Sequence, residues 1–209
     1  MATRSASASA SAGGTPATTT GRGARRPSAR ARARLTRDGI AEAGARLARE
    51  HDLRSLTMQS VGDALGVTAM ALYKHFASKA ELVDAVLDRF VADAAVTAHG
   101  VAPSDWKAWM AATFGAMHRA LALTPGVLSY VAIGDEVRFG DRARDALRES
   151  LAVLRAAGFT KAEARHAYRS ALALAVGYAF VDRQVEPARA ASAFDRALRQ
   201  YLAGLERAR

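Results

Sequence analysis

The segment spanning residues 57–82, TMQSVGDALGVTAMALYKHFASKAEL, is dense in signals that start and stop helices. Its spacing predicts two short helices joined by a tight turn at Gly66, followed by a third helix that begins after Ser78. Gly66 fits the left-handed position that ends a helix, where a Cβ atom would be costly. Thr68 is a good N-cap for the second helix, and Ser78 and Glu81 have the spacing of a capping box. The segment therefore predicts a helix-turn-helix, whose second helix enters the major groove of DNA.

The same region resembles the DNA-binding domain of the TetR (tetracycline-repressor) family over about residues 36–90. The strongest part is LGVTAMALYKHFASKAEL, because the family has Leu-Gly-Val, a short recognition helix, then Leu-Tyr-x-His-Phe, a small polar residue, Lys and Leu. One departure is Gly62, where the family usually places alanine at the close crossing of two helices. The matching residues are Leu65, Gly66, Val67, Leu72, Tyr73, His75, Phe76, Ser78, Lys79 and Leu82.

The composition favours an all-helical protein, since alanine and leucine abound and there are only five prolines. No run of about 18 uncharged apolar residues occurs, so no membrane-spanning helix is expected. The chain has no cysteine, which excludes disulfides and thiol chemistry and fits a cytoplasmic protein.

Basic charge is concentrated at the start of the chain. The formal net charge is +10, and residues 1–34 contribute seven arginines and no acid, which leaves +3 for the rest. A basic tail points to a polyanionic partner, nucleic acid first and an anionic membrane surface second. The arm is either a solvated tail without a role or an extra DNA contact, as in basic arms that enter the minor groove. Its arginines are Arg4, Arg22, Arg25, Arg26, Arg30, Arg32 and Arg34.

Changes in composition and the start and stop signals of helices divide the chain into three parts. We expect a disordered basic arm over residues 1–34, a helix-turn-helix domain over 35–80, and a helical effector-binding and dimerisation domain over 81–209. Helices are predicted over 36–51, 57–65, 68–75, 78–99, 104–123, from 124, over 142–157 and 160–183, and from 192 to the end. The predicted fold class is all-α.

DNA contacts are predicted from the resemblance and from side-chain chemistry. The resemblance implies that Tyr73 and Lys79 contact phosphates, whereas His75 either contacts a phosphate or has a capping or packing role. Gln59 and Lys74 are best suited to hydrogen-bond base edges or phosphates. The other base-reading positions are largely apolar and offer van der Waals contact, for example to thymine methyl groups. They are Thr68, Ala69, Met70 and Ala71 in the recognition helix and Met58 in the helix before it.

Aromatic and methionine side chains are frequent in the second domain. Most of them must be ordinary core, but the resemblance implies a cavity that binds a small effector and is lined by such residues with few polar groups. His118 and Tyr168 are candidates for those polar groups. The candidate effector-binding residues are Trp106, Trp109, Met110, Phe114, Met117, His118, Tyr130 and Tyr168.

Two helical faces are more apolar than an exposed helix should be, and we expect them to pair with their copies as a homodimer. They carry Ala164, Ala167, Ala171, Leu174, Ala175 and Tyr178 over 160–183, and Phe194, Leu198, Tyr201, Leu202 and Leu205 in the last helix. The resemblance also implies this four-helix bundle. A two-fold dimer would bind a palindromic operator.

No catalytic constellation competes with this interpretation. The histidines lack metal-binding spacing, and nucleophile-elbow, P-loop and dinucleotide fingerprints are missing from the sequence. We expect no enzyme activity, cofactor or metal. The resemblance implies a ligand-responsive transcriptional regulator, most simply a repressor that a small effector releases from its operator. The alternative is an architectural protein that coats double-stranded DNA through the basic arm without sequence preference.

Overall fold

The described structure is built from helices, as the sequence predicts. The computed structural model describes residues 35–97, 99–133 and 140–207, and within these ranges it contains α-helices, one 3-10 turn and no strand. The elements are α2 (Arg37–Glu50), η1 (Leu53–Ser55), α3 (Met58–Leu65), α4 (Ala69–Leu72), α5 (Lys79–Asp93), α6 (Trp106–Ala122), α7 (Pro125–Ile133), α8 (Asp141–Ala156), α9 (Lys161–Val181) and α10 (Pro187–Arg207).

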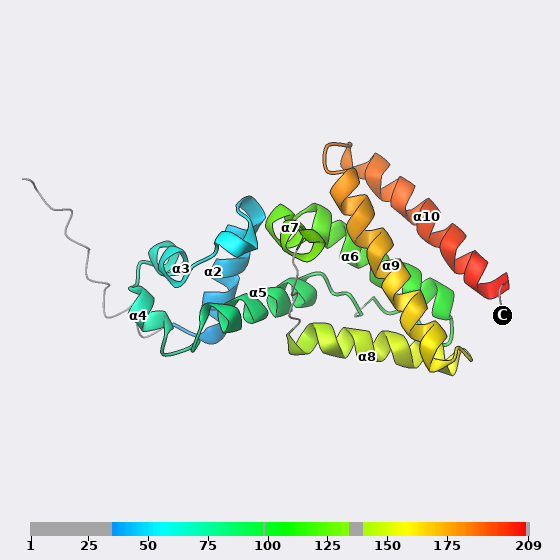
Figure 1. Cartoon of the computed structure of the whole chain (residues 1–209), viewed down its shortest axis with the longest axis horizontal. Helices are drawn as coiled ribbons and strands as arrows, with labels where there is room; N and C mark the ends of the chain where they lie inside the picture. The colour runs from blue at the N-terminus through cyan, green and yellow to red at the C-terminus, as the bar shows by residue number, and fades with distance from the viewer. Residues whose placement is uncertain (1–34, 98, 134–139, 208–209) are drawn as a thin grey trace, which may run out of the picture.

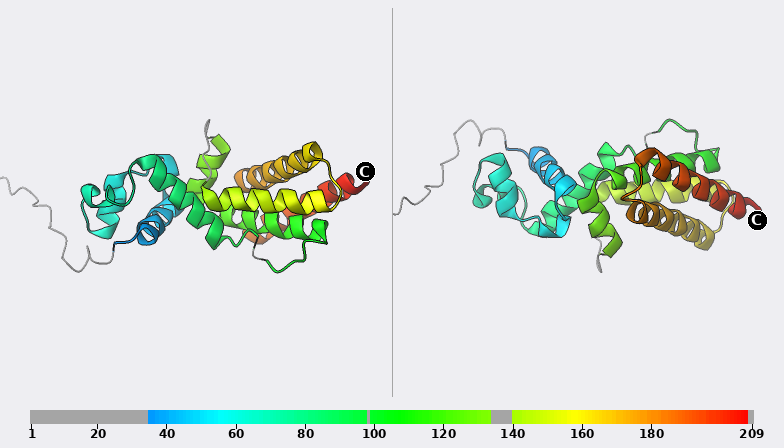
Figure 2. Two further views of the ribbon diagram at one scale, coloured as in Figure 1. Left: turned by 90° about the horizontal axis from the view of Figure 1, so that it is seen from below. Right: turned by 90° about the horizontal axis from the view of Figure 1, so that it is seen from above.

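The helices form two groups joined by α5. Figure 1 shows α2, α3 and α4 at one end of an elongated molecule and α6 to α10 at the other, with α5 running from the first group to the second. The views in Figure 2 show the same separation from below and from above. Helix α5 packs on both α2 and α8, so it is a direct mechanical link between the groups.

Side-chain caps begin several helices, but Thr68, the predicted N-cap of the recognition helix, occupies the N-cap position without a side-chain capping hydrogen bond. The Thr57 hydroxyl accepts a hydrogen bond from the Ser60 amide, and the Thr160 hydroxyl accepts one from the Glu163 amide in a complete capping box. At Ser78 the box is only half formed. The Ser78 hydroxyl accepts from the Glu81 amide at 3.2 Å, but the Glu81 carboxylate accepts from the Ala77 amide at 2.7 Å.

Three helix boundaries differ from the sequence prediction. The recognition helix covers only Ala69–Leu72 and continues as hydrogen-bonded turns to Phe76 rather than as a helix over 68–75. Helix α5 ends at Asp93, before a turn in which Ala95 has a φ of 48°. Helix α10 starts at Pro187 and not near residue 192, because the Glu186 carboxylate accepts hydrogen bonds from the first free amides. Proline is favourable in the first turn, where its missing N–H has no helical partner to lose.

Two clusters of buried side chains form the core. The first joins the helix-turn-helix to the second group, since Ile40, Leu72 and Phe76 belong to the same cluster as Leu121 of α6 and Val127 of α7. The second lies among α6, α8, α9 and α10 and contains Trp109, Met110, Phe114, Phe194 and Leu198.

Most of the residues assigned to a dimer are already covered within one chain, so their assignment is wrong, whereas Leu174, Tyr178, Tyr201 and Leu205 are half-buried. Ala164, Ala167, Ala171 and Ala175 of α9 are at most 1 % exposed, and Phe194, Leu198 and Leu202 of α10 are at most 3 % exposed. They pack against α6 and against each other. Helical periodicity shows that a face is buried but not which element covers it, which is the reason for the error.

Candidate nucleic-acid interface and ligand cavity

Helices α3 and α4 cross at very short range. Gly66 has a φ of 67° and ends α3, and the Val67 amide then donates to the Gly62 carbonyl at 2.9 Å. A Cβ atom on Gly62 would stand 2.9 Å from the Val67 oxygen and 3.3 Å from the Ala69 nitrogen. The glycine therefore lets the start of α4 lie directly on α3, closer than a side chain would allow.

The recognition segment presents one face to the core and the other to solvent. Val67, Leu72 and Phe76 are buried and fix its position. On the outer face the Met70 residue is 72 % exposed and Tyr73 is 49 % exposed. Met70, Tyr73 and the exposed Lys74 therefore lie on the solvent side of the segment, accessible to a partner.

The predicted DNA-contact residues fall into three sets. Thr68, Lys74 and Lys79 are exposed, like Met70 and Tyr73, while Ala69, Ala71 and His75 are half-buried. Gln59 is exposed, and its amide donates to the Asp63 carboxylate at 2.7 Å. Met58 is 5 % exposed and belongs to the first core cluster, so it supports α3 from below rather than facing outward.

Arg37 is a residue of this region that the sequence did not single out. Its guanidinium pairs with the Glu81 carboxylate at 2.7 Å, donates to the His75 carbonyl and lies over the Phe76 ring, 4.2 Å from its centroid. The Ala77 amide and then the Arg37 guanidinium hold the pKa of Glu81 below its usual range. Arg37 thus ties the end of the recognition segment to α2 and α5. An arginine just after an N-cap threonine carries no signal of such a role.

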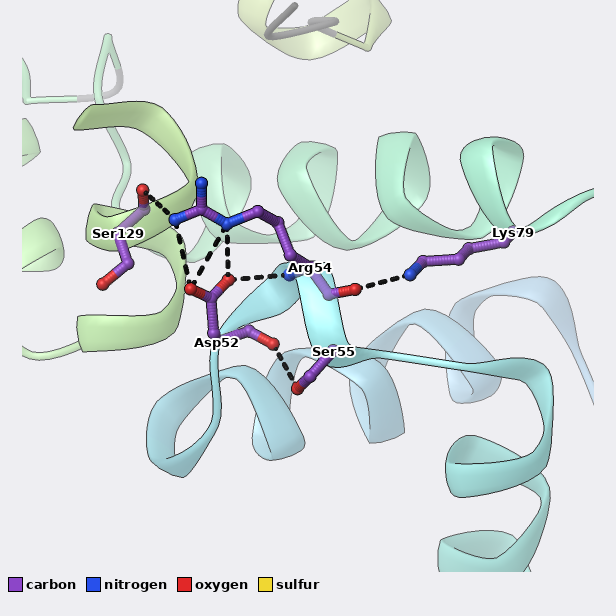
Figure 3. A network of polar contacts seen from close by, with 5 residues as sticks. All are labelled: Asp52, Arg54, Ser55, Lys79 and Ser129. Atoms are coloured by element: carbon purple, nitrogen blue, oxygen red, sulfur yellow. Dashed lines mark hydrogen bonds and ion pairs between the residues drawn. The ribbon is translucent and has the colours of Figure 1, made fainter. Parts of the chain in front are cut away.

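Lys79 is held by the loop that contains η1. Its ammonium donates to the Arg54 carbonyl at 2.5 Å, and the Arg54 side chain pairs with Asp52 and donates to the Ser129 carbonyl of α7 at 3.0 Å (Figure 3). An ammonium group has several N–H donors, so one bond to Arg54 leaves donors for an anion.

The folded DNA-binding half has no excess of charge. Residues 35–82 contain six lysines and arginines and six acids. Any attraction to DNA from this part must therefore be local, whereas seven of the ten net positive charges lie in residues 1–34, whose structure is outside the described residues. The basic set is Arg37, Arg46, Arg49, Arg54, Lys74 and Lys79, and the acidic set is Asp38, Glu42, Glu50, Asp52, Asp63 and Glu81.

A cavity of about 100 Å³ lies among α5 and four helices of the second group, α6 to α9. Its wall is almost entirely apolar, apart from Tyr168 and Arg144, and burial raises the pKa of the Tyr168 phenol. The lining residues are Leu87, Phe90 and Val91 of α5, Met117 and Leu121 of α6, Val127 and Val131 of α7, Ala143, Arg144, Ala146 and Leu147 of α8, and Tyr168, Leu172 and Val176 of α9.

Of the eight candidate effector residues, Met117 and Tyr168 line this cavity. Trp106, Trp109, Met110 and Phe114 belong to the second core cluster, and Tyr130 is half-buried on α7. Most residues of the observed wall were not predicted, because they are ordinary aliphatic residues.

His118 lies apart from this cavity. It is 2 % exposed and stacks on Phe194 with ring centroids 4.2 Å apart, and neither ring nitrogen has a hydrogen-bond partner. Burial lowers the pKa of His118.

None of the described helices has the length and apolar character needed to cross a membrane.

Comparison with known sequences gives matches that cover only part of the chain. Residues 40–86 match the family model of bacterial regulatory proteins, tetR family. A stretch of 65 residues is 40 % identical to the HTH-type transcriptional repressor DrrR1 of Streptomyces coeruleorubidus, and it covers 31 % of this chain. The match spans only about a quarter of the length of that curated relative (24 %).

Solved structures match nearly the whole described fold. A TetR variant from Acinetobacter baumannii AYE in complex with minocycline superposes with a TM-score of 0.69 at 24 % identity, over 84 % of this chain and 98 % of that one. BioQ with its natural double-stranded DNA operator gives a TM-score of 0.60 at 24 % identity, over 82 % and 98 %. At this identity the structures share the fold, and the family model identifies the helix-turn-helix. Residues 40–86 thus match the tetR family of bacterial regulatory proteins, and the described chain shares the fold of the solved TetR structure.

Proposed function

We propose that this protein is a ligand-responsive transcriptional regulator, most simply a repressor, that binds a palindromic operator through α3 and α4. The observation that carries the proposal is the exposed face of the recognition segment, where Met70 and Tyr73 project beside Lys74 and Lys79. The family-model match of residues 40–86, the 65-residue match to a transcriptional repressor and the fold shared with an operator-bound regulator support it. No enzyme activity is part of the proposal.

In this proposal α4 reads bases mainly by shape and apolar contact. Thr68, Ala69, Met70 and Ala71 would meet base edges in the major groove, and Met70 is suited to pack on thymine methyl groups. Gln59 would reach a base or phosphate by exchanging its bond to Asp63. Met58 contributes by holding α3 in place from the core.

Lys79, Tyr73 and Lys74 would contact phosphates and position the helix without reading sequence. His75 is held near the same surface because its carbonyl accepts from Arg37. Residues 1–34 would add sequence-independent affinity, since the folded half is neutral.

The domain division follows from these roles. Residues 1–34 form the basic arm, 35–80 the DNA-binding domain and 81–209 the effector-binding and dimerisation domain of a protein that works in the cytoplasm. The first core cluster extends across the last boundary, which supports the transmission of a movement from one domain to the other.

We place the effector in the apolar cavity. Its wall lacks the convergent charges needed for an ionic ligand, so the effector class is an uncharged, largely apolar small molecule. Because typical ligand pockets hold about 300–1,000 Å³, occupation of a 100 Å³ cavity would have to push the surrounding helices apart. Such a difference between two states is what a ligand needs to shift an equilibrium.

The homodimer would form through the outer faces of α9 and α10, beside the faces that the chain buries. Ala173 and Gly177 of α9 and Ala193 of α10 are exposed, and a Cβ on Gly177 or Gly204 would meet nothing within 4 Å. Small residues let two helices approach closely, which suits a four-helix bundle of two copies.

The test is selection of DNA from a random pool by the full chain. A regulator enriches one palindromic sequence and binds it as two chains, with a large preference over bulk DNA. An architectural protein binds every sequence with similar affinity and enriches none. That second outcome would overturn the proposal.

A further inference from the structure

The N-terminus of α8 is capped by a side chain from another helix. Both oxygens of the Asp88 carboxylate on α5 accept backbone hydrogen bonds, one from the Asp141 amide and one from the Arg142 amide, each at 3.0 Å. Gly140 occupies the N-cap position of α8, and the helix has no side-chain cap of its own. The first amides of a helix have no hydrogen-bond partner within the helix. In α8 the Asp88 carboxylate of α5 provides that partner.

The approach of the two helices at this point requires glycine. A Cβ atom on Gly140 would stand 2.2 Å from Asp88 Oδ1 and 2.3 Å from its Cγ. The φ of Gly140 is −68°, which any residue adopts, so the need for glycine comes from the closeness of Asp88 and not from the backbone conformation.

The cap lies at the edge of the apolar cavity. Leu87, the neighbour of Asp88, lines the cavity from α5, and Ala143 and Arg144, which follow Arg142, line it from α8. On its other side Asp88 borders an open polar groove together with Arg37, Arg89 and Arg142. Water in that groove can solvate the carboxylate and the freed amides, so the cap can open without leaving buried polar groups unsatisfied.

We propose that the Asp88 cap is a latch between the two halves of the protein, closed when the cavity is empty and opened by an occupant that separates α5 from α8. Closed, it fixes α5, and with it the recognition segment that Glu81 and Arg37 tie to α5. Open, α5 is released and the recognition helices of a dimer lose their fixed spacing. The inference rests on the proposed function for its effect on DNA, but the latch itself is defined by the two hydrogen bonds.

Hydrogen exchange at the Asp141 and Arg142 amides reports the latch directly. We expect protection in the wild type and its loss in Asp88→Ala. The link to the cavity is tested at Ala146, which is buried in its wall. Ala146→Leu adds an isopropyl group that the cavity can hold and should keep the protection, whereas Ala146→Trp adds an indole ring that overfills it and should remove the protection. Equal protection in both variants would overturn the link.

Operator affinity tests the consequence for regulation. Asp88→Ala and Gly140→Ala should each weaken binding to the selected operator by about fivefold or more, the lower end of coupling between sites. Because each change opens the same contact, the double variant should bind no worse than either single variant. Asp93→Ala is the matched control, since it removes the same charge from α5 but only breaks the surface pair with Arg89.

Two results separate the latch from a purely structural cap. Asp88→Asn keeps an acceptor oxygen and should bind operator between the wild type and Asp88→Ala, which also covers the case in which the alanine variant fails to fold. If Asp88→Asn and Gly140→Ala bind operator like Asp93→Ala although their amides exchange quickly, the cap is structural and the latch is overturned. If the wild type selects no operator, the proposed function fails, and the exchange experiment with the Ala146 variants still decides whether the cavity controls the cap.

Discussion

The Lys79 ammonium donates a hydrogen bond to the carbonyl of Arg54, with Nζ and O separated by 2.5 Å (Figure 3). A cation in the first turn of a helix is opposed by the macrodipole. The Arg54 carbonyl is an internal partner that offsets this cost. It also orients the side chain, because Arg54 is in turn fixed by Asp52 and by the Ser129 carbonyl of α7.

Replacing both Tyr73 and Lys79 by alanine should weaken binding to operator and non-operator DNA by about the same factor. Both residues are proposed phosphate contacts, which position the protein without reading bases. The slope of log affinity against log salt should fall by about 1 for the lost lysine. Titrations of both DNAs at several salt concentrations measure this. An unchanged operator affinity in a folded double variant would contradict the assignment.

Arg37→Ala should loosen the recognition segment. It removes the ion pair with Glu81, the bond to the His75 carbonyl and the contact with the Phe76 ring, and we expect a loss of about 1 kcal/mol in the free energy of unfolding. Operator affinity should fall as well. Arg46→Ala on the same helix changes the charge equally and is the control in urea unfolding and DNA titration. Equal behaviour of the two variants would show that Arg37 is an ordinary surface residue.

Deletion of residues 1–34 should leave the helical content intact and reduce DNA affinity, mostly at low salt. The arm carries seven of the ten net charges, and residues 35–82 are neutral. Binding curves at two salt concentrations test this, with circular dichroism as the control for folding. A truncated chain that binds as well as the full chain at both concentrations would make the arm a passive tail.

His118 should make stability depend on pH. Its pKa is lowered by burial, so the folded protein binds its proton less readily than the unfolded chain does. The free energy of unfolding should therefore be unaffected by this group above the unfolded pKa, about 6.5, and should fall as the pH drops below it. His118→Phe keeps a ring on Phe194 and removes the titration. The slope of the urea midpoint plotted against pH should therefore become smaller between about pH 7 and pH 5. Burial also lowers the pKa of His99, so a smaller slope should remain and should vanish in the double variant with His99→Gln. A slope equal to that of the wild type in His118→Phe would refute the assignment.

Gly177→Glu should separate the proposed dimer while keeping the fold. The position is exposed on α9, the added side chain meets open space in the single chain, and glutamate favours a helix more than glycine does. Leu198→Glu and Leu202→Glu cannot serve this purpose because both residues are buried in the single chain. Light scattering should give a dimer for the wild type and for the control Ala152→Glu on α8, and a monomer for Gly177→Glu. A wild-type monomer at micromolar concentration would contradict the dimer itself.

Local signals predicted the fold well because they act within a few residues. Thr57, Gly66 and Thr160 set helix ends through contacts with their own neighbours, so their roles can be inferred from spacing. The start of the last helix was placed near residue 192 rather than at Pro187 for a local reason as well, since this first turn depends on the Glu186 carboxylate that caps the helix.

Long-range roles were not predictable in the same way. The cavity wall draws aliphatic residues from five helices, and no spacing marks Leu87 and Leu172 as neighbours of one space. Arg37 and Asp88 act across gaps in the chain, through the His75 carbonyl and the α8 amides. In the sequence, a charged residue on an amphipathic helix looks like any other solvated charge. Only the folded structure shows which distant group it contacts.

The corner between α8 and α9 has a consequence for the order of folding. Gly158 has a φ of 93°, the Phe159 amide returns to the Leu154 carbonyl, and the next helix starts at once with the Thr160 box. The loop is so short that its closure costs little entropy, and its end groups are satisfied locally. Phe159 also meets the Trp106 ring edge to face at 5.0 Å. We therefore expect this hairpin to be an early nucleus, on which α6 docks before the more distant contacts with the DNA-binding half form.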